Sequence, residues 1–248
     1  MISALRCAGS GGPLMERKAE KKILLFLVEG LTDMQALSLP VSHIFRDYNV
    51  RFQVIRTDVT SDESVTPKTI EKELTGRVDR FLAEYPFVRK GDIGRIIQLI
   101  DTDGAFVGPQ YIKQAGDRRT AYSEEEILAK DKERLLLRNM RKRTIVYKLV
   151  HTQALKSTIP YEVYYFSRNM EHVLQKDASD RLTKQEKEAY AFSFADRYDG
   201  NEQGFLSLLG SDELNVPGTY EETWHFIMEG TASLRRYSNF YHLFRQLL

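Results

Sequence analysis

The sequence predicts an α/β fold, in which a mainly parallel sheet of about four strands is flanked by helices on both faces. Two apolar runs, residues 23–28 and 96–100, have the length of buried strands, and acidic residues and a glycine follow each of them directly. One alternating segment and two helical segments lie between these runs, so the chain reads β-α-β-α-β. Folds of this kind build their sites at the carboxyl ends of the strands.

The first half of the chain supplies the segments between the two apolar runs. Residues 33–46 are expected to form a helix, which Pro40 should kink or divide. Residues 50–55 alternate between apolar and polar side chains and are expected to form the second strand. In residues 67–85 apolar side chains recur every three or four positions, and Pro67 suits the first turn of that helix.

The second half is predicted to be mostly helical. A capping box at residues 123–126 is expected to open a helix that carries a basic cluster. A fourth strand is expected at residues 163–166. Further helices are predicted at residues 184–198, after the capping residue Thr219, and at residues 233–248.

This pattern divides the chain of 248 residues into three parts. Residues 1–20 are rich in small and polar side chains at their start and are predicted to be disordered. Residues 21–175 are predicted to form a catalytic domain with a helical basic insertion at about 105–158. Residues 176–248 are predicted to form a helical C-terminal region.

Composition points to the cytoplasm. The apolar fraction of 42% and the charged fraction of 29% are those of ordinary soluble proteins. No apolar stretch approaches the roughly 20 residues that span a bilayer, and the N-terminus lacks the apolar centre of a signal peptide. The single cysteine, Cys7, excludes an internal disulfide. We therefore expect a cytoplasmic location and no membrane partner.

The net charge of +1 does not by itself indicate a nucleic-acid-binding protein. Between residues 130 and 148, however, eight lysines and arginines face only two acids. Such a cluster would neutralise several phosphates of a nucleic acid, but it would equally suit a solvated helix face. On the first interpretation, four of its members are predicted to bind the substrate backbone: Arg138, Arg141, Lys142 and Arg143.

Four acidic residues are predicted to meet at the carboxyl ends of the strands. Glu29 and Asp33 straddle the first strand-to-helix turn, four positions apart, so they should lie one helical turn apart on one face. Asp101 and Asp103 follow the third strand two positions apart, and an extended segment would point both to one side. Four carboxylates at one place repel each other unless a cation lies among them, and carboxylate oxygens suit Mg²⁺ or Mn²⁺.

The order strand–Glu-Gly-x-x-Asp, then βαβ, then strand–Asp-x-Asp resembles the TOPRIM domain shared by topoisomerases, primases and several nucleases. The Glu-x-x-x-Asp version is most similar to the overcoming-lysogenization-defect (OLD) nucleases and related phage-defence proteins. The resemblance covers roughly residues 22–175 and implies a nuclease that hydrolyses phosphodiester bonds of DNA or RNA. It implies that metal is held by Glu29, Asp33, Asp101 and Asp103, and that Glu171, after the fourth strand, belongs to the site.

The same resemblance sets further expectations. OLD nucleases carry an ATPase domain, and no Walker A sequence is present here, so any ATPase or regulatory subunit would be a separate partner. A lysine that stabilises charge in some members would correspond to Lys113 or Lys156. Independently of the resemblance, Arg168 lies beside the predicted site and would clamp a phosphate or pair with an acid. The aromatic and apolar side chains of the C-terminal helix make it a candidate homodimer interface.

Two other interpretations remain. In a haloacid-dehalogenase-like phosphatase, Asp101 would be the nucleophile and Asp103 the acid/base. A later strand should then be followed by an acidic pair, but the candidates Asp196, Asp199 and residues 211–213 do not follow a predicted strand. In the other interpretation the chain is a non-catalytic regulatory subunit with TOPRIM-like architecture, although all four acids are retained.

Overall fold

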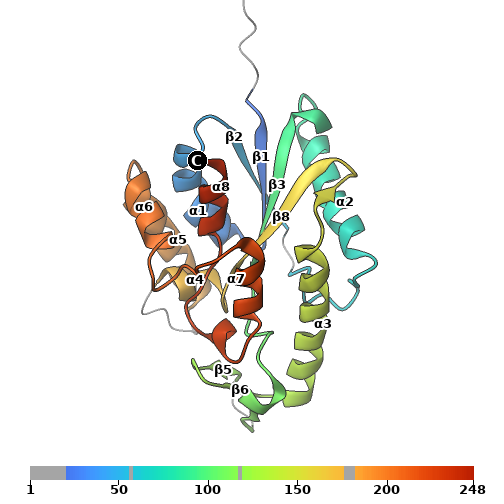
Figure 1. The fold of residues 1–248 in the computed structure, drawn as a ribbon, viewed down its shortest axis with the longest axis vertical. Helices are drawn as coiled ribbons and strands as arrows, with labels where there is room; N and C mark the ends of the chain where they lie inside the picture. Colours follow the sequence, from blue (N-terminus) through green and yellow to red (C-terminus); the bar gives the residue numbers. More distant parts are fainter. Residues whose placement is uncertain (1–20, 56–57, 117–118, 176–181) are drawn as a thin grey trace, which may run out of the picture.

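A parallel sheet forms the centre of the computed structural model, which describes residues 21–55, 58–116, 119–175 and 182–248. Five strands lie in the order β2-β1-β3-β8-β7 (Figure 1). The predicted α/β class and mainly parallel sheet are therefore confirmed. The segment 1–20, predicted to be disordered, lies outside the described residues.

The four long strands are parallel to one another, and a short antiparallel strand completes one edge. In register, Phe26 of β1 lies opposite Phe52 of β2 on one side and Ile97 of β3 on the other. All four parallel strands therefore end at the same edge of the sheet. The strands are β1 (Ile23–Val28), β2 (Asn49–Val54), β3 (Ile93–Asp101), β8 (Ile159–Phe166) and the antiparallel β7 (Ala154–Leu155).

Helices cover both faces of the sheet (Figure 1). One face carries α2, α3 and α7, and the other carries α1, α5, α6 and α8. None of the helices in the described ranges is long and apolar enough to cross a membrane. The helices are α1 (Leu31–Ile44), α2 (Ile70–Glu84), α3 (Lys132–Val150), α4 (Met170–Leu174), α5 (Lys184–Tyr198), α6 (Glu202–Leu209), α7 (Tyr220–Ile227) and α8 (Tyr241–Leu247), with 3₁₀ turns η1 (Lys90–Asp92), η2 (Pro109–Tyr111) and η3 (Ala232–Leu234).

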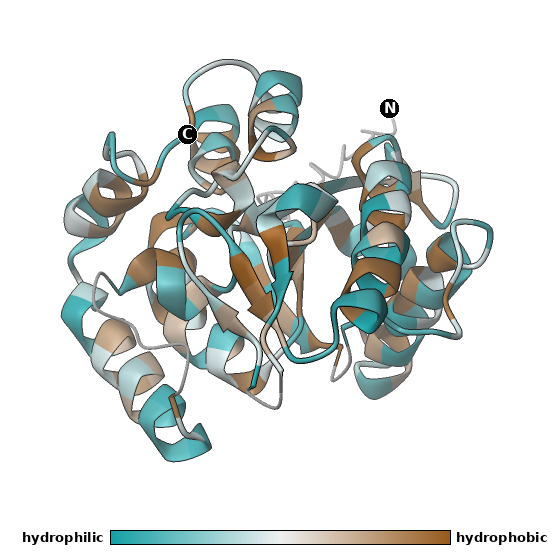
Figure 2. Ribbon diagram, turned by 90° about the horizontal axis from the view of Figure 1, so that it is seen from below, coloured by the Kyte–Doolittle hydropathy of each residue, from teal (hydrophilic) through white to brown (hydrophobic). Residues whose placement is uncertain are grey.

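The strand β1 is buried on both faces, which explains why its sequence is apolar without alternation. Leu25 and Leu27 face the layer of α2 and α3, whereas Leu24 and Phe26 face the layer of α1 and α5. Successive side chains of a strand point to opposite faces, so a strand covered on both sides needs apolar residues at every position. Figure 2 shows the same distribution, with hydrophobic colour on the central strands and mainly hydrophilic colour on outer surfaces of the helices.

The insertion contains a second, small sheet that the sequence did not predict. Its strands are β4 (Ile112–Gln114), β6 (Ile127–Ala129) and β5 (Ala121–Tyr122), in that order. The prediction that residues 123–126 open a helix was wrong. Ser123 Oγ accepts hydrogen bonds from the backbone N–H groups of Glu125 and Glu126, but this closes a turn between strands. The helix α3 begins later, where Asp131 caps it by accepting from the N–H of Arg134.

The C-terminal segment also differs from its prediction, because residues 233–248 do not form one helix. Ser238 pairs with Phe166 at the end of β8, and the Asn239 side chain accepts a 2.9 Å hydrogen bond from the N–H of Tyr165. The outer edge of β8 would otherwise bury unpaired backbone groups, which is costly. An extended segment therefore precedes α8, which is short.

Other elements follow the sequence more closely. The helix α5 has the predicted bounds, and Thr219 caps α7 as expected. Pro40 does not divide α1, which continues to Ile44. The strand β8 begins four residues earlier than predicted. The proposed division into a domain at 21–175 and a region at 176–248 stays a prediction.

Candidate functional site

The carboxyl edge of the sheet brings together all five acids that the sequence singled out. Glu29 directly follows β1 and Asp101 ends β3, and these strands are neighbours. The charges of Asp33 and Asp103 act on both Glu29 and Asp101. Glu171, in α4 just after β8, acts on Asp33. The cluster therefore draws its acids from the ends of three of the parallel strands.

Asp33 has two roles at once. Its Oδ2 atom accepts a 2.9 Å hydrogen bond from the N–H of Gly30, which closes the first turn of α1. This is the ordinary helix-capping role of an acid at that position. Its carboxylate nevertheless belongs to the acidic cluster, since its charge raises the pKa of Asp101.

A sixth acid, Asp58, was missed in the sequence. It lies in the loop after β2, so it comes from the same edge as the other acids. Hydrogen bonds of 3.0 Å from the N–H of Thr60 and 3.2 Å from that of Ser61 hold its Oδ1 atom. The rule that selected Glu29 and Asp101 also selects Asp58, because it is the first acid after a parallel strand.

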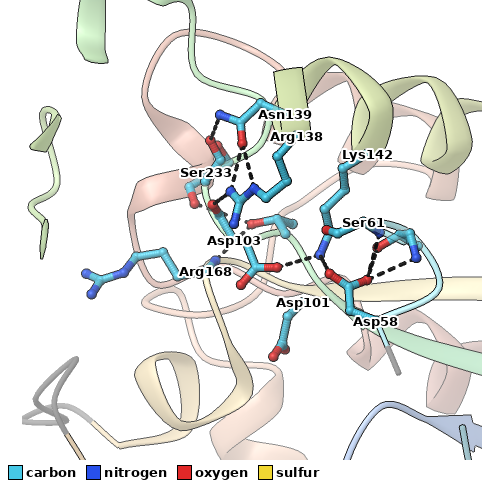
Figure 3. A network of polar contacts seen from close by, with 12 residues as sticks. Asp58, Ser61, Asp101, Asp103, Arg138, Asn139, Lys142, Arg168 and Ser233 are labelled. Atoms are coloured by element: carbon cyan, nitrogen blue, oxygen red, sulfur yellow. Dashed lines mark hydrogen bonds and ion pairs between the residues drawn. The ribbon is translucent and has the colours of Figure 1, made fainter. Parts of the chain in front are cut away.

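Lys142 of α3 projects its ammonium group into this cluster (Figure 3). Its Nζ atom lies 2.6 Å from Asp103 Oδ2 and 3.0 Å from Asp58 Oδ2, and its side chain is 0% exposed. Burial alone would lower the pKa of Lys142. The carboxylates of Asp103, Glu29 and Asp58 outweigh this effect and hold that pKa above its ordinary value.

The acids of the cluster differ in their protonation. Burial, together with neighbouring negative charges, raises the pKa values of Glu29 and Asp101 well above their ordinary values. Burial and the nearby Glu171 raise the pKa of Asp33 to about 6. Burial would also raise the pKa of Asp58, but Lys142 and hydrogen bonds lower it to about 2. Compared with Glu29, Asp33 and Asp101, Asp58 is therefore the most firmly ionised acid.

The cluster has more negative than positive charge. Lys187 of α5 supplies a second ammonium, 2.9 Å from Glu171 Oε1. Six carboxylates against two lysines would leave a net charge of −4 if every group were ionised. One oxygen, Glu29 Oε1, is buried without a hydrogen-bond partner among the described residues. Such a cluster must take up protons or bind a cation.

The backbone beside these acids is held in an unusual conformation. Asp103 and Arg168 have φ angles of 48° and 56°, which side chains other than glycine rarely adopt. The Asp103 N–H donates to the Arg168 carbonyl over 2.8 Å, and the Arg168 N–H donates to Thr102 Oγ1 over 2.8 Å. Non-glycine residues held in this region cluster at functional sites, where surrounding contacts maintain them.

Gly104 completes this turn. Its φ angle is 64°, and a Cβ atom built on it would meet Leu234 Cδ2 at 2.9 Å and Ile127 Cδ1 at 3.0 Å. The glycine of the Asp-x-Asp-Gly motif is therefore required both by its conformation and by the close approach of η3 and the small sheet.

The predicted substrate-binding residues of α3 divide into two groups. Arg138 Nη2 donates to the Asp103 carbonyl over 2.7 Å, and Arg143 donates to the carbonyls of Ala105 and Val107 over 2.6 and 2.7 Å. These contacts fix the loop after β3. Arg141 instead lines a groove of about 620 Å³, which it shares with the basic residues Lys130, Arg134 and Arg138 and with the acids Asp62, Glu63 and Asp131.

Arg168 does not face the carboxylates. Its side chain extends away from Asp101 and Asp103 (Figure 3), and its guanidinium carbon lies 5.3 Å from the centre of the Tyr122 ring. Lys113 pairs with Glu126, and Lys156 pairs with Asp79. The lysine that reaches the acids is therefore Lys142.

The donor set suits Mg²⁺ or Mn²⁺ in its chemistry, because it consists of carboxylate oxygens and includes the unpartnered Glu29 Oε1. Within the described ranges, however, no group of three or more His, Cys, Asp or Glu side chains is arranged so that it could hold a metal ion. Asp58 and Asp103 are directed to Lys142, which explains part of this result.

Comparisons with known proteins give no relative. The chain matches no protein-family model, no curated protein and no solved structure.

Proposed function

We propose that this chain is a divalent-cation-dependent nuclease of the TOPRIM type, which hydrolyses phosphodiester bonds of DNA or RNA. The observation that carries the proposal is the convergence of six carboxylates at the carboxyl edge of a parallel sheet, with a buried Glu29 oxygen that lacks a partner. The strained backbone at Asp103 and Arg168 supports a functional site at the same edge of the sheet. The TOPRIM-like order of the motifs supports the reaction class.

The residues would act as follows. Glu29, Asp33, Asp101 and Asp103 would hold Mg²⁺ or Mn²⁺, which when bound polarises a phosphoryl oxygen and lowers the pKa of an attacking water. Glu171 has little exposure and is paired with Lys187, so its role would be to orient α4 and Asp33. Lys142 would place a fixed positive charge beside Asp103.

The groove along α3 would guide the substrate backbone. Lys130, Arg134 and Arg141 line it together with the acids Asp62, Glu63 and Asp131, and Arg138 joins it to the loop that carries Asp103. Phosphate contacts of this kind position a nucleic acid without reading its sequence. Binding would then weaken steeply as the salt concentration rises. A phage-defence role and a separate ATPase or regulatory partner are proposals that rest on the family resemblance, and a homodimer is a proposal that rests on the aromatic C-terminal segment.

A phosphatase of the haloacid-dehalogenase type is less well supported. In such a phosphatase an acidic pair should follow a strand later than β3. The long strand of the central sheet that comes after β3 in the chain is β8. Among the described residues between β8 and α5, Glu171 is the only acid, whereas Asp196 lies within α5 and Asp199 follows that helix.

The proposal is tested by cleavage of plasmid DNA and total tRNA with Mg²⁺ or Mn²⁺. Glu29→Gln keeps the size of the side chain and removes its charge, and Glu84→Gln, on the exposed end of α2, is the matched control. We expect wild type and the control to cleave one of the substrates, and Glu29→Gln and EDTA-treated protein not to.

Equal cleavage by wild type and Glu29→Gln would refute the assignment of the site. Hydrolysis of a generic phosphomonoester, lost in Asp101→Asn and without nuclease activity, would instead establish the phosphatase. Failure of wild type to cleave either substrate or the phosphomonoester would favour the regulatory-subunit interpretation.

A further inference from the structure

Lys142 places a positive charge inside the carboxylate cluster. Lysine side chains are almost never fully buried unless they are paired. Here the ammonium has two carboxylate partners, Asp103 at 2.6 Å and Asp58 at 3.0 Å, whose side chains are 31% and 28% exposed. The ammonium therefore lies beneath two acids that themselves reach solvent.

Asp58 is held in place to receive this ammonium. Its Oδ1 atom accepts hydrogen bonds from the backbone N–H groups of Thr60 and Ser61, while its Oδ2 atom faces Lys142. Each oxygen thus has a separate, defined partner. Asp58 holds the Lys142 ammonium by this contact, so it is a positioning residue, and its charge also acts on Glu29.

The helix that carries Lys142 is itself tied to the loop of Asp103. Arg138 and Asn139 donate to the backbone carbonyls of Asp103 and Gly104, over 2.7 and 3.4 Å. Lys142 lies one turn further along α3 and on its buried face. Because these contacts fix the helix against the loop, the ammonium cannot leave Asp103 unless α3 moves.

Neither Glu29 nor Asp101 forms an ion pair in the described part of the chain, although the charge of Lys142 acts on both. Glu29 Oε1 is buried without a hydrogen-bond partner in the described part of the chain. Asp101 Oδ1 accepts a 3.1 Å hydrogen bond from the N–H of Met170, which is a neutral donor. Glu29 follows β1 and Asp101 ends the neighbouring strand β3, and the charge of Glu29 acts on Asp101, so these two acids lie close together.

We propose that Lys142, positioned by Asp58, takes the place of one cation in this cluster, so that the chain binds a single divalent cation on the side of Glu29 and Asp101. The inference rests on the proposed function only in taking a divalent cation as the ligand. It goes further in giving Asp58 a role and in assigning Asp103 to Lys142.

The first test is rescue of stability by metal. Lys142→Met keeps the apolar stem and removes the charge, Lys142→Arg keeps the charge, and Lys148→Met removes an exposed lysine of the same helix that pairs with Glu71. Without metal, we expect the thermal midpoint of Lys142→Met to fall by roughly 10 °C. Addition of Mn²⁺ should restore most of this loss, because the ion supplies the missing charge.

The control variants should show no rescue beyond the shift that Mn²⁺ gives wild type. A Lys142→Met protein as stable as wild type without metal would overturn the inference. So would a Lys142→Met protein that is destabilised, or unfolded, to the same extent with and without Mn²⁺.

The second test counts bound Mn²⁺ by calorimetry and electron paramagnetic resonance, independently of any cleavage. Wild type and Lys148→Met should bind one ion per chain, and Lys142→Met should bind two. Two ions on wild type, or an unchanged number on Lys142→Met, would contradict the inference. No ion on wild type would contradict the inference and would also refute the metal dependence of the proposed nuclease, whereas two ions on wild type would contradict the inference alone.

Discussion

The two ends of the strand β3 carry the same kind of side chain in opposite circumstances. Asp92, just before the strand, is half-buried and accepts a 2.7 Å hydrogen bond from the N–H of Arg89. Asp101, the last residue of the strand, lies among other acids, and burial raises its pKa. The difference shows that the pKa of an aspartate is shifted at the carboxyl edge of the sheet, where several strand ends converge and bring acidic side chains together.

The ion pairs at the two ends differ in the same way. Near the amino edge, Arg95 and Glu162 form a one-to-one pair at 2.6 Å between neighbouring strands. At the carboxyl edge, one lysine serves both Asp58 and Asp103 and leaves Glu29 Oε1 unpartnered. The amino edge is electrically balanced, whereas the carboxyl edge requires protons or a further cation.

The largest expected effect compares the two aspartates of β3 directly. Asp101→Asn should lower nuclease activity on the order of 10³-fold or more, equivalent to about 4 kcal/mol of activation free energy, because it removes a charge from the site. Asp92→Asn should change the rate less than about twofold. Cleavage rates of the two purified variants under saturating Mg²⁺ decide the matter. Similar losses in both would show that the carboxyl edge has no special role.

A smaller effect is expected on the free energy of unfolding when the glycines are compared. Gly104→Ala places a Cβ atom against Leu234 and Ile127 at a φ angle of 64°, whereas Gly200→Ala has a φ angle of 67° and open space. Strain alone should cost about 1 kcal/mol, and the steric clash should add about 1–3 kcal/mol for Gly104→Ala. Urea denaturation of both variants measures the difference. Equal losses would indicate that the turn at the site tolerates a side chain.

The pH dependence of stability tests the protonation of the carboxyl edge. Asp33 has a pKa of about 6 in the fold, raised from 3.8, so its contribution to stability is present below pH 3.8 and is lost as the pH rises to about 6. In metal-free protein, Asp33→Asn should therefore increase the free energy of unfolding at pH 7.5 by at most about 3 kcal/mol.

The same variant should show little difference from wild type at pH 3.5, where both side chains are neutral. Denaturation curves in EDTA at the two pH values give the comparison. A stabilisation of the same size at both values would mean that the effect of Asp33→Asn does not arise from charge.

The smallest effect is expected at the amino edge. A double-mutant cycle on Arg95→Met and Glu162→Gln should give a coupling energy of about 1 kcal/mol or less, since both side chains are about a quarter exposed. The coupling should also fall as salt is added. A coupling above about 2 kcal/mol that is insensitive to salt would remove the contrast between the two edges.

Much of the framework could be predicted from local patterns. The apolar runs of β1 and β3 and the acids that follow them are continuous in sequence, and so are the capping residues of α5 and α7. Local patterns failed where a long-range contact decided the outcome. Ser123 has a side chain that could cap a helix. Ile127 instead pairs with Ile112 and Tyr122 in the small sheet, so Ser123 closes a turn between strands.

The sequence by itself indicated the four long strands of the central sheet and the acids that follow three of them, because strand burial and strand ends leave a local signature. Tertiary structure alone decided that Lys142 joins Asp58, 84 residues away, and that Ser238 pairs with Phe166. A basic residue in a basic helix gives no sign of which face will be buried against acids. That choice depends on how α3 packs on the sheet, and packing is set by the whole core rather than by any one segment.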